Sequence, residues 1–101
     1  MRGDAEQASH PGEILLLEFL EPVSISQSEL ARAMKVPRMR ISELVRGERS
    51  VSVDTALRLA RVLNTTAEFW LNLQADYDLR LARQNNNAEI EALTPLRRAT
   101  G

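Results

Sequence analysis

A short stretch in the middle of the chain carries side chains that proteins use to contact duplex DNA. The stretch contains Arg38, Met39, Arg40, Ser42, Glu43, Arg46 and Arg49. An arginine can pair with the edge of guanine through two hydrogen bonds, and an apolar side chain such as methionine can contact the methyl group of thymine. Glu43 is suited to accept a hydrogen bond from cytosine or to orient Arg46. The pattern predicts a surface that reads duplex DNA. The alternative is an ordinary solvated helix face, on which Arg and Glu are common.

The charges are distributed unevenly along the chain, although the net charge is only −1. Residues 32–61 contain eight basic and three acidic side chains, whereas residues 1–31 contain six acidic side chains and one arginine. A basic segment between acidic flanks is the charge pattern expected of a protein that binds the phosphates of nucleic acid. The distribution therefore supports DNA as a partner, where the total charge alone would argue against it.

Other kinds of chemistry lack the residues that they need. The chain has one histidine and no cysteine, no glycine-rich phosphate loop and no spaced set of carboxylates with histidine. We therefore expect no enzyme activity, no cofactor or metal and no small-molecule substrate. No apolar run approaches the ~20 residues of a membrane helix, and residues 1–9 are polar rather than a secretion signal. These features predict a cytoplasmic protein.

Apolar residues recur at helical spacing in five segments, and none shows the alternation that is typical of a strand. In the first segment Pro11 suits an initial helical turn, and the helix must end before Pro22. The second segment opens with Ser26 and Glu29, which have the spacing of a capping box. The third ends at Gly47, which can adopt the left-handed conformation of a helix stop.

The remaining segments complete an all-α prediction. The fourth helix follows a cap at Ser52, and the fifth opens with a second capping box at 65–68 and runs to about 83. Residues 84–87 are predicted to form a loop or frayed helix end, and residues 88–94 a further short helix before a loose tail. We therefore expect five to six helices. The expected organisation is a polar arm at 1–9, a DNA-binding and dimerisation domain at 10–83, and a C-terminal extension at 84–101.

The second and third segments match the pattern of a helix-turn-helix. A small residue early in the first of its helices lets the two helices approach closely, and Ala31 occupies that position. Ile41 and Leu44 supply the apolar residues of the seam. Lys35 stands where the turn usually has glycine; a non-glycine residue in the left-handed conformation costs ~1–2 kcal/mol, which a domain can absorb.

In this arrangement the third segment is the recognition helix, with its apolar residues facing inward. The opposite face then carries Met39, Ser42, Glu43 and Arg46. Arg38 and Arg40 lie at the amino-terminal end, which usually meets the base edges. Gln27 starts the first motif helix and Arg49 follows the recognition helix, so both are predicted to contact phosphates.

The fifth segment carries two apolar stripes, although a terminal helix needs only one to pack on its own domain. One stripe contains Trp70, Leu73, Tyr77 and Leu81. The other contains Leu71, Ala75, Leu79 and Ala82. We expect this second stripe, together with Trp70, to form a self-complementary homodimer contact, since paired half-sites ~34 Å apart require a dimer. The alternative is that one domain covers both sides of the helix.

Three segments together resemble the HigA-type antitoxins, which belong to the lambda-repressor-like, or Xre, superfamily. They are His-Pro-Gly-Glu-Ile at 10–14, the helix-turn-helix at 26–47, and Thr-Thr-Ala-Glu-Phe-Trp-Leu-Asn-Leu-Gln-Ala-Asp-Tyr-Asp-Leu-Arg at 65–80. The helix-turn-helix is general to the superfamily. The other two segments are more specific to the antitoxins, so the resemblance implies a lambda-repressor-like fold across about 10–83.

The resemblance also implies a dual role. Such proteins repress their own operon as homodimers on a palindromic operator, and they bind and neutralise a toxin encoded alongside, typically a basic ribonuclease of the RelE or HigB type. The acidic side chains of the first third, Glu13, Glu18 and Glu21, would complement such a toxin and steer its association. Lys35 and the unmatched residues 84–101 depart from the family pattern.

Two other functions remain open. One is a free-standing Xre-type repressor without a toxin partner, which the absence of a gene for a small basic protein beside this one would favour. The other is an interaction module whose helix-turn-helix no longer binds DNA. The arginine-rich recognition helix opposes the second, and a salt-dependent affinity for duplex DNA would exclude it.

Overall fold

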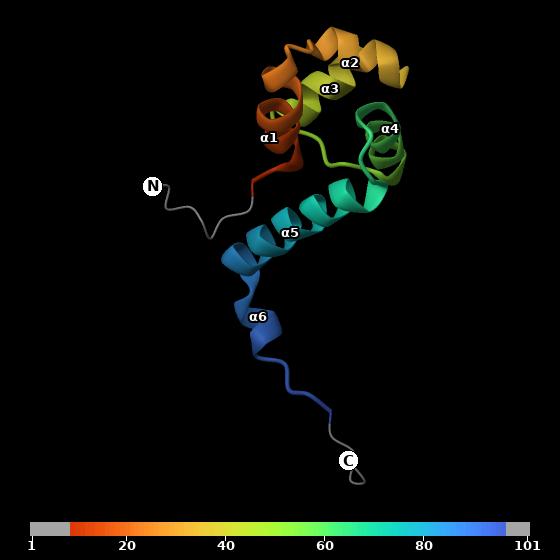
Figure 1. The fold of residues 1–101 in the computed structure, drawn as a ribbon. Coiled ribbons are helices and arrows are strands. Elements are labelled where there is room, and N and C mark those ends of the chain that lie inside the picture. The colour runs from red at the N-terminus through yellow and green to blue at the C-terminus, as the bar shows by residue number, and fades with distance from the viewer. Residues whose placement is uncertain (1–8, 97–101) are drawn as a thin grey trace.

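The computed structural model describes residues 9–96, and within that range every regular element is helical (Figure 1). The elements are α1 (Pro11–Ile14), the π-helical turn η2 (Leu15–Leu20), the 3₁₀ turn η3 (Glu21–Val23), α2 (Gln27–Met34), α3 (Arg38–Val45), α4 (Val53–Leu63), α5 (Ala67–Asn86) and α6 (Ala88–Glu91). The all-α prediction is therefore confirmed. The predicted arm at 1–9 lies outside the described residues except for Ser9, as does the end of the extension at 97–101.

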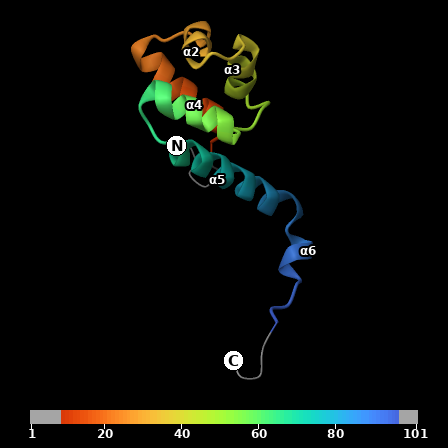
Figure 2. The same ribbon diagram turned by 90° about the vertical axis from the view of Figure 1, so that its right-hand side faces the viewer.

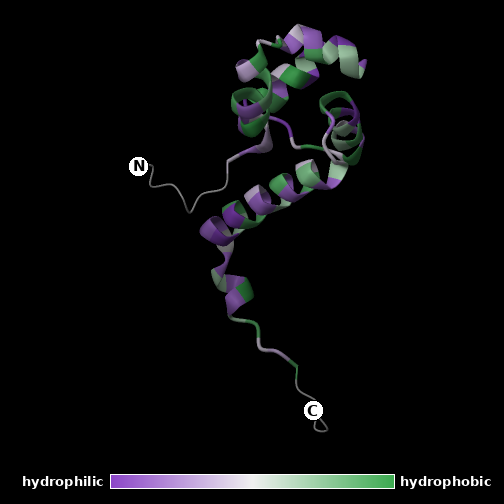
Figure 3. Cartoon of the chain, in the orientation of Figure 1, coloured by the Kyte–Doolittle hydropathy of each residue, from purple (hydrophilic) through white to green (hydrophobic). Residues whose placement is uncertain are grey.

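The first four helices form a compact body, and α5 crosses beneath it before leading to α6 (Figures 1 and 2). The helix α4 packs against α2 and α5, while α1 packs against α3 and α5. The last turns of α5 and the short α6 extend away from the body (Figure 2). Apolar residues gather where the helices of the body meet, and polar and apolar residues alternate along α5 (Figure 3).

The core contains the residues that the helix-turn-helix pattern assigns to the seam between α2 and α3. Ala31, Ile41 and Leu44 are all buried, as predicted. The other buried apolar side chains are Leu15, Leu20, Leu30, Met34, Val51, Ala56, Leu59 and Trp70. Residues from all five of the longer helical segments therefore meet in one core, which fixes the position of α3 on the surface of the body.

The local signals at the ends of α2 and α3 are confirmed. The Ser26 hydroxyl accepts a hydrogen bond from the Glu29 backbone N–H at 3.0 Å, and the Glu29 carboxylate accepts one from the Ser26 backbone N–H at 3.3 Å. Lys35 adopts the left-handed conformation in the turn (φ 58°), and Gly47 adopts it after α3 (φ 76°). The turn therefore accommodates a lysine in the left-handed conformation that glycine usually adopts there.

The predicted second capping box is wrong by one residue. Thr66, not Thr65, caps α5, because its hydroxyl accepts a hydrogen bond from the Phe69 N–H at 3.1 Å. The Thr65 hydroxyl instead accepts a hydrogen bond from the Trp70 indole N–H at 2.8 Å. Of the two alternatives predicted for 84–87, a loop or a frayed helix end, the structure agrees with the helix end, since α5 continues to Asn86.

The first helical segment contains a π-helical turn that the sequence did not reveal. The Glu21 backbone N–H bonds to the Leu16 carbonyl, five residues earlier. A π-helical turn places residues five apart near one another, and Leu15 and Leu20 are both buried. Leu17, which belongs to the apolar pattern of this segment, is 49% exposed instead.

A buried glutamine ties the loop between α3 and α4 to α5. The Gln74 carbonyl oxygen accepts a hydrogen bond from the Val51 N–H at 2.7 Å, and its amide donates to Asp78 at 3.0 Å. A buried N–H left without a partner costs ~1–3 kcal/mol, so this contact stabilises the loop substantially. The same loop carries Glu48 and Arg49 at the end of α3.

Candidate nucleic-acid interface

The recognition helix α3 presents one face to the core and the other to solvent. Met39 is 66% exposed, and Arg38 and Arg46 are also exposed. Ser42 and Glu43 are half-buried on the same helix. No side chain caps the amino-terminal end of α3, because its N-cap is Pro37. The open N–H groups there favour an anion such as a DNA phosphate.

Arg40 is held at the start of α3 by a chain of contacts. Its guanidinium contacts the Asp54 carboxylate at 3.1 Å, and Asp54 also accepts a hydrogen bond from Arg58 at 2.9 Å. Arg58 in turn donates to the Met34 carbonyl at the end of α2, at 2.7 Å. These hydrogen bonds, chiefly the one from Arg58, hold the pKa of Asp54 below its usual value. The chain links α2, α4 and α3, so it orients Arg40 relative to the turn.

Arg46 and Arg49 are paired with carboxylates beside α3. Arg46 forms two hydrogen bonds with Glu48, at 3.2 and 3.0 Å, and a third with the Ser42 hydroxyl. The hydrogen bond from Arg46 holds the pKa of Glu48 below its usual value. Arg49 donates twice to one oxygen of Glu43, at 3.0 and 2.9 Å. The prediction that Glu43 orients Arg46 is therefore wrong: Glu48 holds Arg46, and Glu43 holds Arg49.

Arg38 differs from the other arginines of this surface. It is the first residue of α3, it is exposed, and it forms no ion pair or hydrogen bond with the side chains of residues 9–96. Gln27 stands at the first position of α2, where it is half-buried. The structure thus brings together Ser42 with Arg46 and Glu43 with Arg49. It leaves Arg38 and Met39 available at the amino-terminal half of α3.

Sequence reasoning missed two members of this surface, Glu48 and Asp54. Both lie outside α3. Asp54 contacts Arg40 in that helix, and Glu48 contacts Arg46, the residue that follows it. The only available signal was their position among the three acidic residues of an otherwise basic segment. Which arginine each one contacts depends on the path of the loop between α3 and α4, which the sequence alone does not define.

The histidine at the start of α1 has a structural role. The His10 Nδ1 atom accepts a hydrogen bond from the Gly12 N–H at 2.9 Å, and its ring lies edge-on to Tyr77 with 4.9 Å between centroids. Burial lowers the pKa of His10, which favours the neutral ring that this acceptor role requires. His10 therefore joins α1 to α5.

The two apolar stripes of α5 have different environments. Trp70 is fully buried and lies 5.1 Å from Phe19 and 4.9 Å from Phe69 between ring centroids. Its assignment to a dimer contact is therefore wrong, because Trp70 offers no surface to a partner. In the second stripe Leu71 is half-buried against the core, while Ala75, Leu79 and Ala82 are exposed. This part of the stripe has no partner among residues 9–96.

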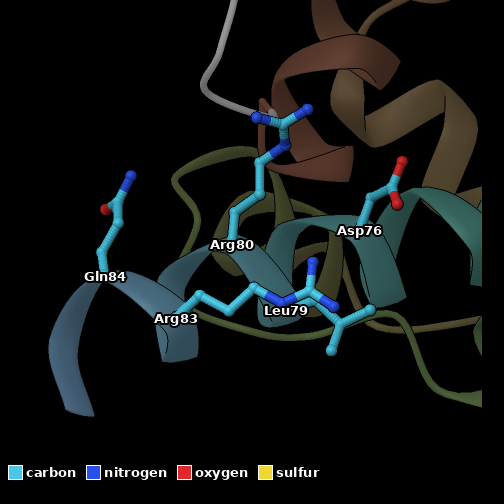
Figure 4. A pocket seen from close by; sticks show the side chains of 5 residues that line it. All are labelled: Asp76, Leu79, Arg80, Arg83 and Gln84. Atoms are coloured by element: carbon cyan, nitrogen blue, oxygen red, sulfur yellow. The ribbon is translucent and has the colours of Figure 1, made fainter. Parts of the chain in front are cut away.

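A surface hollow lies on α5 beside this stripe. It is lined by Asp76, Leu79, Arg80, Arg83 and Gln84 (Figure 4). Because one helix supplies every lining residue, the hollow lacks the enclosing walls of a small-molecule site. In the described part of the chain no cluster of acidic, histidine or cysteine side chains has the arrangement of a metal site. None of its helices is long and apolar enough to cross a membrane.

The acidic side chains that the sequence analysis assigned to toxin binding are exposed. Glu13, Glu18 and Glu21 are all exposed along the helical stretch from α1 to η3. The exposed Leu17 lies between them in the sequence. An apolar side chain among solvated carboxylates was not predicted for this surface.

Comparisons with known proteins agree with this architecture. A family model described as Helix-turn-helix matches residues 16–70. The chain is 38% identical to the antitoxin HigA-1 of Vibrio cholerae serotype O1, over 95% of this chain and 90% of that protein. It is 40% identical to the uncharacterized HTH-type transcriptional regulator YbaQ of Escherichia coli K12, over 90% of this chain and 80% of that protein.

Solved structures give the same assignment. The structure of the Pseudomonas aeruginosa antitoxin HigA with the higBA promoter is similar to this chain, with a TM-score of 0.85 and 43% sequence identity. The match spans 90% of this chain and 100% of the P. aeruginosa chain. These relatives are helix-turn-helix antitoxins and regulators rather than enzymes, as the sequence predicted. The chain therefore belongs to the helix-turn-helix family, and within it to the HigA-type antitoxins.

Proposed function

We propose that this protein is an antitoxin that represses its own operon as a dimer on operator DNA and neutralises a RelE- or HigB-type ribonuclease by binding it in the cytoplasm. The observation that carries the DNA-binding part is the exposed amino-terminal half of α3, with Arg38 unpaired among residues 9–96. The fold supports the same conclusion, because the similar P. aeruginosa antitoxin was solved with its promoter.

The base-reading and phosphate-binding roles follow from position on the helix-turn-helix. Arg38, Met39 and Arg40 occupy the first turn of α3, which meets base edges in this motif. Gln27 starts α2 and Arg49 follows α3, and we assign both to phosphate contacts, which fix the register of the protein on DNA. Ser42, Glu43 and Arg46 complete the proposed DNA-binding surface.

The dimer is proposed to form through the second stripe of α5. Ala75, Leu79 and Ala82 are exposed, and Leu71 extends the stripe toward the core. Small residues beside one leucine allow two copies of a helix to approach each other closely, and a two-fold contact repeats every residue on both sides. Such a dimer would present two recognition helices to a palindromic site.

Replacing Leu79 with glutamate is expected to convert the dimer into a monomer. The leucine lies on the face of α5 away from the core, so the fold of the single chain should survive. Each dimer would bury two unpaired carboxylates at the contact, which is strongly unfavourable. Size-exclusion chromatography with light scattering measures the result. Gln84→Glu, a change to the same residue elsewhere on α5, should remain dimeric. A dimeric Leu79→Glu variant would contradict this interface.

The toxin is proposed to bind the acidic surface formed by Glu13, Glu18 and Glu21. All three are exposed, and their charge is opposite to that of a basic ribonuclease. The exposed Leu17 would supply an apolar contact within this surface. The surface lies on a different segment from α3, so the toxin and DNA need not compete for the same side chains.

A repressor without a toxin partner is the second candidate, and the similarity to the E. coli regulator supports it. Operator binding tests the part that both candidates share. The wild-type dimer should bind a duplex from its own promoter more tightly than a scrambled duplex of equal composition, as measured by fluorescence anisotropy. Equal affinity for the two duplexes would contradict the repressor function. Repeating the titration with the product of the adjacent gene then separates the antitoxin from a plain repressor.

A further inference from the structure

All three acidic side chains within the basic segment 32–61 contact an arginine of the proposed DNA-binding surface. The pairs are Glu43 with Arg49, Glu48 with Arg46, and Asp54 with Arg40. These three carboxylates therefore neutralise part of the positive charge of residues 32–61 at the proposed DNA-binding surface.

The pairs of Arg46 and Arg49 use the groups that would otherwise bind phosphate. Arg46 donates to Glu48 through two nitrogen atoms and to Ser42 through the third. Arg49 donates through two nitrogen atoms to Glu43. A guanidinium binds carboxylate and phosphate with the same fork of parallel N–H groups, so neither arginine can fully satisfy both partners at once.

The pair of Arg46 and Glu48 is easy to exchange, whereas the Glu43 side chain that pairs with Arg49 is 28% exposed. The side chains of Arg46 and Glu48 are 54% and 56% exposed, and an exposed ion pair contributes little to folding stability. Asp54 differs, because Arg58 still holds it when Arg40 moves away. Glu43 and Glu48 are therefore the carboxylates that DNA phosphate would displace.

We propose that Glu43 and Glu48 occupy the phosphate positions of Arg49 and Arg46 in the free protein, so that binding of any duplex requires exchange of these internal ion pairs. The exchange leaves two carboxylates without partners next to the DNA backbone, and it therefore keeps the affinity for arbitrary DNA low. This inference rests on the proposed function, since it concerns how the same surface binds duplex DNA.

This exchange should make the affinity for DNA less dependent on salt concentration than the number of arginines at the surface would suggest. Each phosphate that an unpaired cation neutralises releases counterions and makes the slope of log K against log salt steeper by about 0.9. An arginine that first leaves a carboxylate contributes less, because the freed carboxylate takes up a cation. Removing the carboxylate should restore the full contribution.

The variant Glu48→Gln tests the proposal, with Glu68→Gln as its matched control. Both changes remove one negative charge from an exposed side chain, but Glu68 lies at the start of α5 rather than beside α3. Each protein is titrated with the promoter duplex and a scrambled duplex at about 50 to 200 mM salt, a range over which phosphate contacts change affinity strongly. Circular dichroism verifies that each variant is folded.

We expect Glu48→Gln to bind both duplexes about three- to fivefold more tightly than Glu68→Gln at the low end of the salt range. Its salt slope should be steeper by up to about 0.9. The ratio of the two affinities should stay nearly constant, because the exchange is common to both complexes. The double variant Glu43→Gln with Glu48→Gln should increase the effect further.

The outcomes separate this proposal from the function on which it rests. Weaker binding by Glu48→Gln would mean that Glu48 positions Arg46 for DNA, and binding equal to that of Glu68→Gln would mean that no exchange occurs. Either result overturns the proposal while wild-type preference for the promoter duplex persists. If the wild-type protein binds no duplex at all, the repressor function fails first and this inference fails with it.

Discussion

Gly12→Ala is expected to destabilise the domain by about 3 kcal/mol or more, because a Cβ atom at this position has no room. It would lie 1.8 Å from the Leu44 carbonyl oxygen and 2.6 Å from the Leu44 carbonyl carbon. Both are backbone atoms of α3, so no side-chain rotation can relieve the overlap. The helices α1 and α3 would have to separate, and α1 would no longer support the recognition helix.

Urea denaturation measures the loss directly, and thermal unfolding should show a midpoint lowered by about 12 °C or more for a domain of this size. Glu13→Ala is the control, since it changes an exposed neighbour in the same helical turn and should cost at most about 1 kcal/mol. A Gly12→Ala variant within about 1 kcal/mol of the wild type would contradict the close approach of α1 and α3.

Arg38→Ala is expected to weaken binding to the promoter duplex by about 10- to 100-fold, the loss of one bidentate contact with guanine. Arg38 is exposed at the first position of α3, and no side chain of residues 9–96 has to be displaced before it reaches DNA. The fold should be unaffected for the same reason. Fluorescence anisotropy with the promoter duplex measures the change.

Substituted duplexes distinguish base reading from phosphate binding by Arg38. If the side chain reads a base, the variant should lose discrimination at one position of the site while the salt slope changes little. Arg61→Ala is the control, because Arg61 is an exposed arginine on α4 rather than on the recognition helix. Its effect should be within about threefold. Unchanged binding by Arg38→Ala would remove this residue from the interface.

Much of the helix-turn-helix was predictable because its signals are local. Burial of Ala31 and Ile41 follows from residue type and spacing, and the cap at Ser26 follows from a hydroxyl placed three residues before a carboxylate. The left-handed turn at Lys35 was predictable from its position between two helices. None of these features depends on how distant segments meet.

The errors arose where the outcome depends on contacts between segments. The periodicity of α5 revealed two apolar stripes, but not that Trp70 would be buried in contact with Phe19 and Phe69. At the start of the same helix, the predicted capping box assigned the cap to Thr65. The Thr65 hydroxyl instead accepts a hydrogen bond from the indole N–H of Trp70, and the Thr66 hydroxyl caps the helix.

The ion pairs of the proposed DNA-binding surface were beyond sequence reasoning for a similar reason. Glu48 and Asp54 reach their arginines only because the loop between α3 and α4 follows one particular path. The buried contact between Gln74 and Val51 stabilises that path. The DNA-binding surface was predicted mainly from α3, whereas the carboxylates that pair with its arginines also come from the following loop and α4.

Co-expression with the product of the adjacent gene tests the antitoxin function most directly. Cells that express the neighbouring protein alone should stop growing, and cells that also express this chain should grow normally and yield a stable complex of the two proteins on purification. If the neighbouring protein is harmless, or if it stays toxic and no complex forms, the antitoxin function is contradicted and only the repressor function remains.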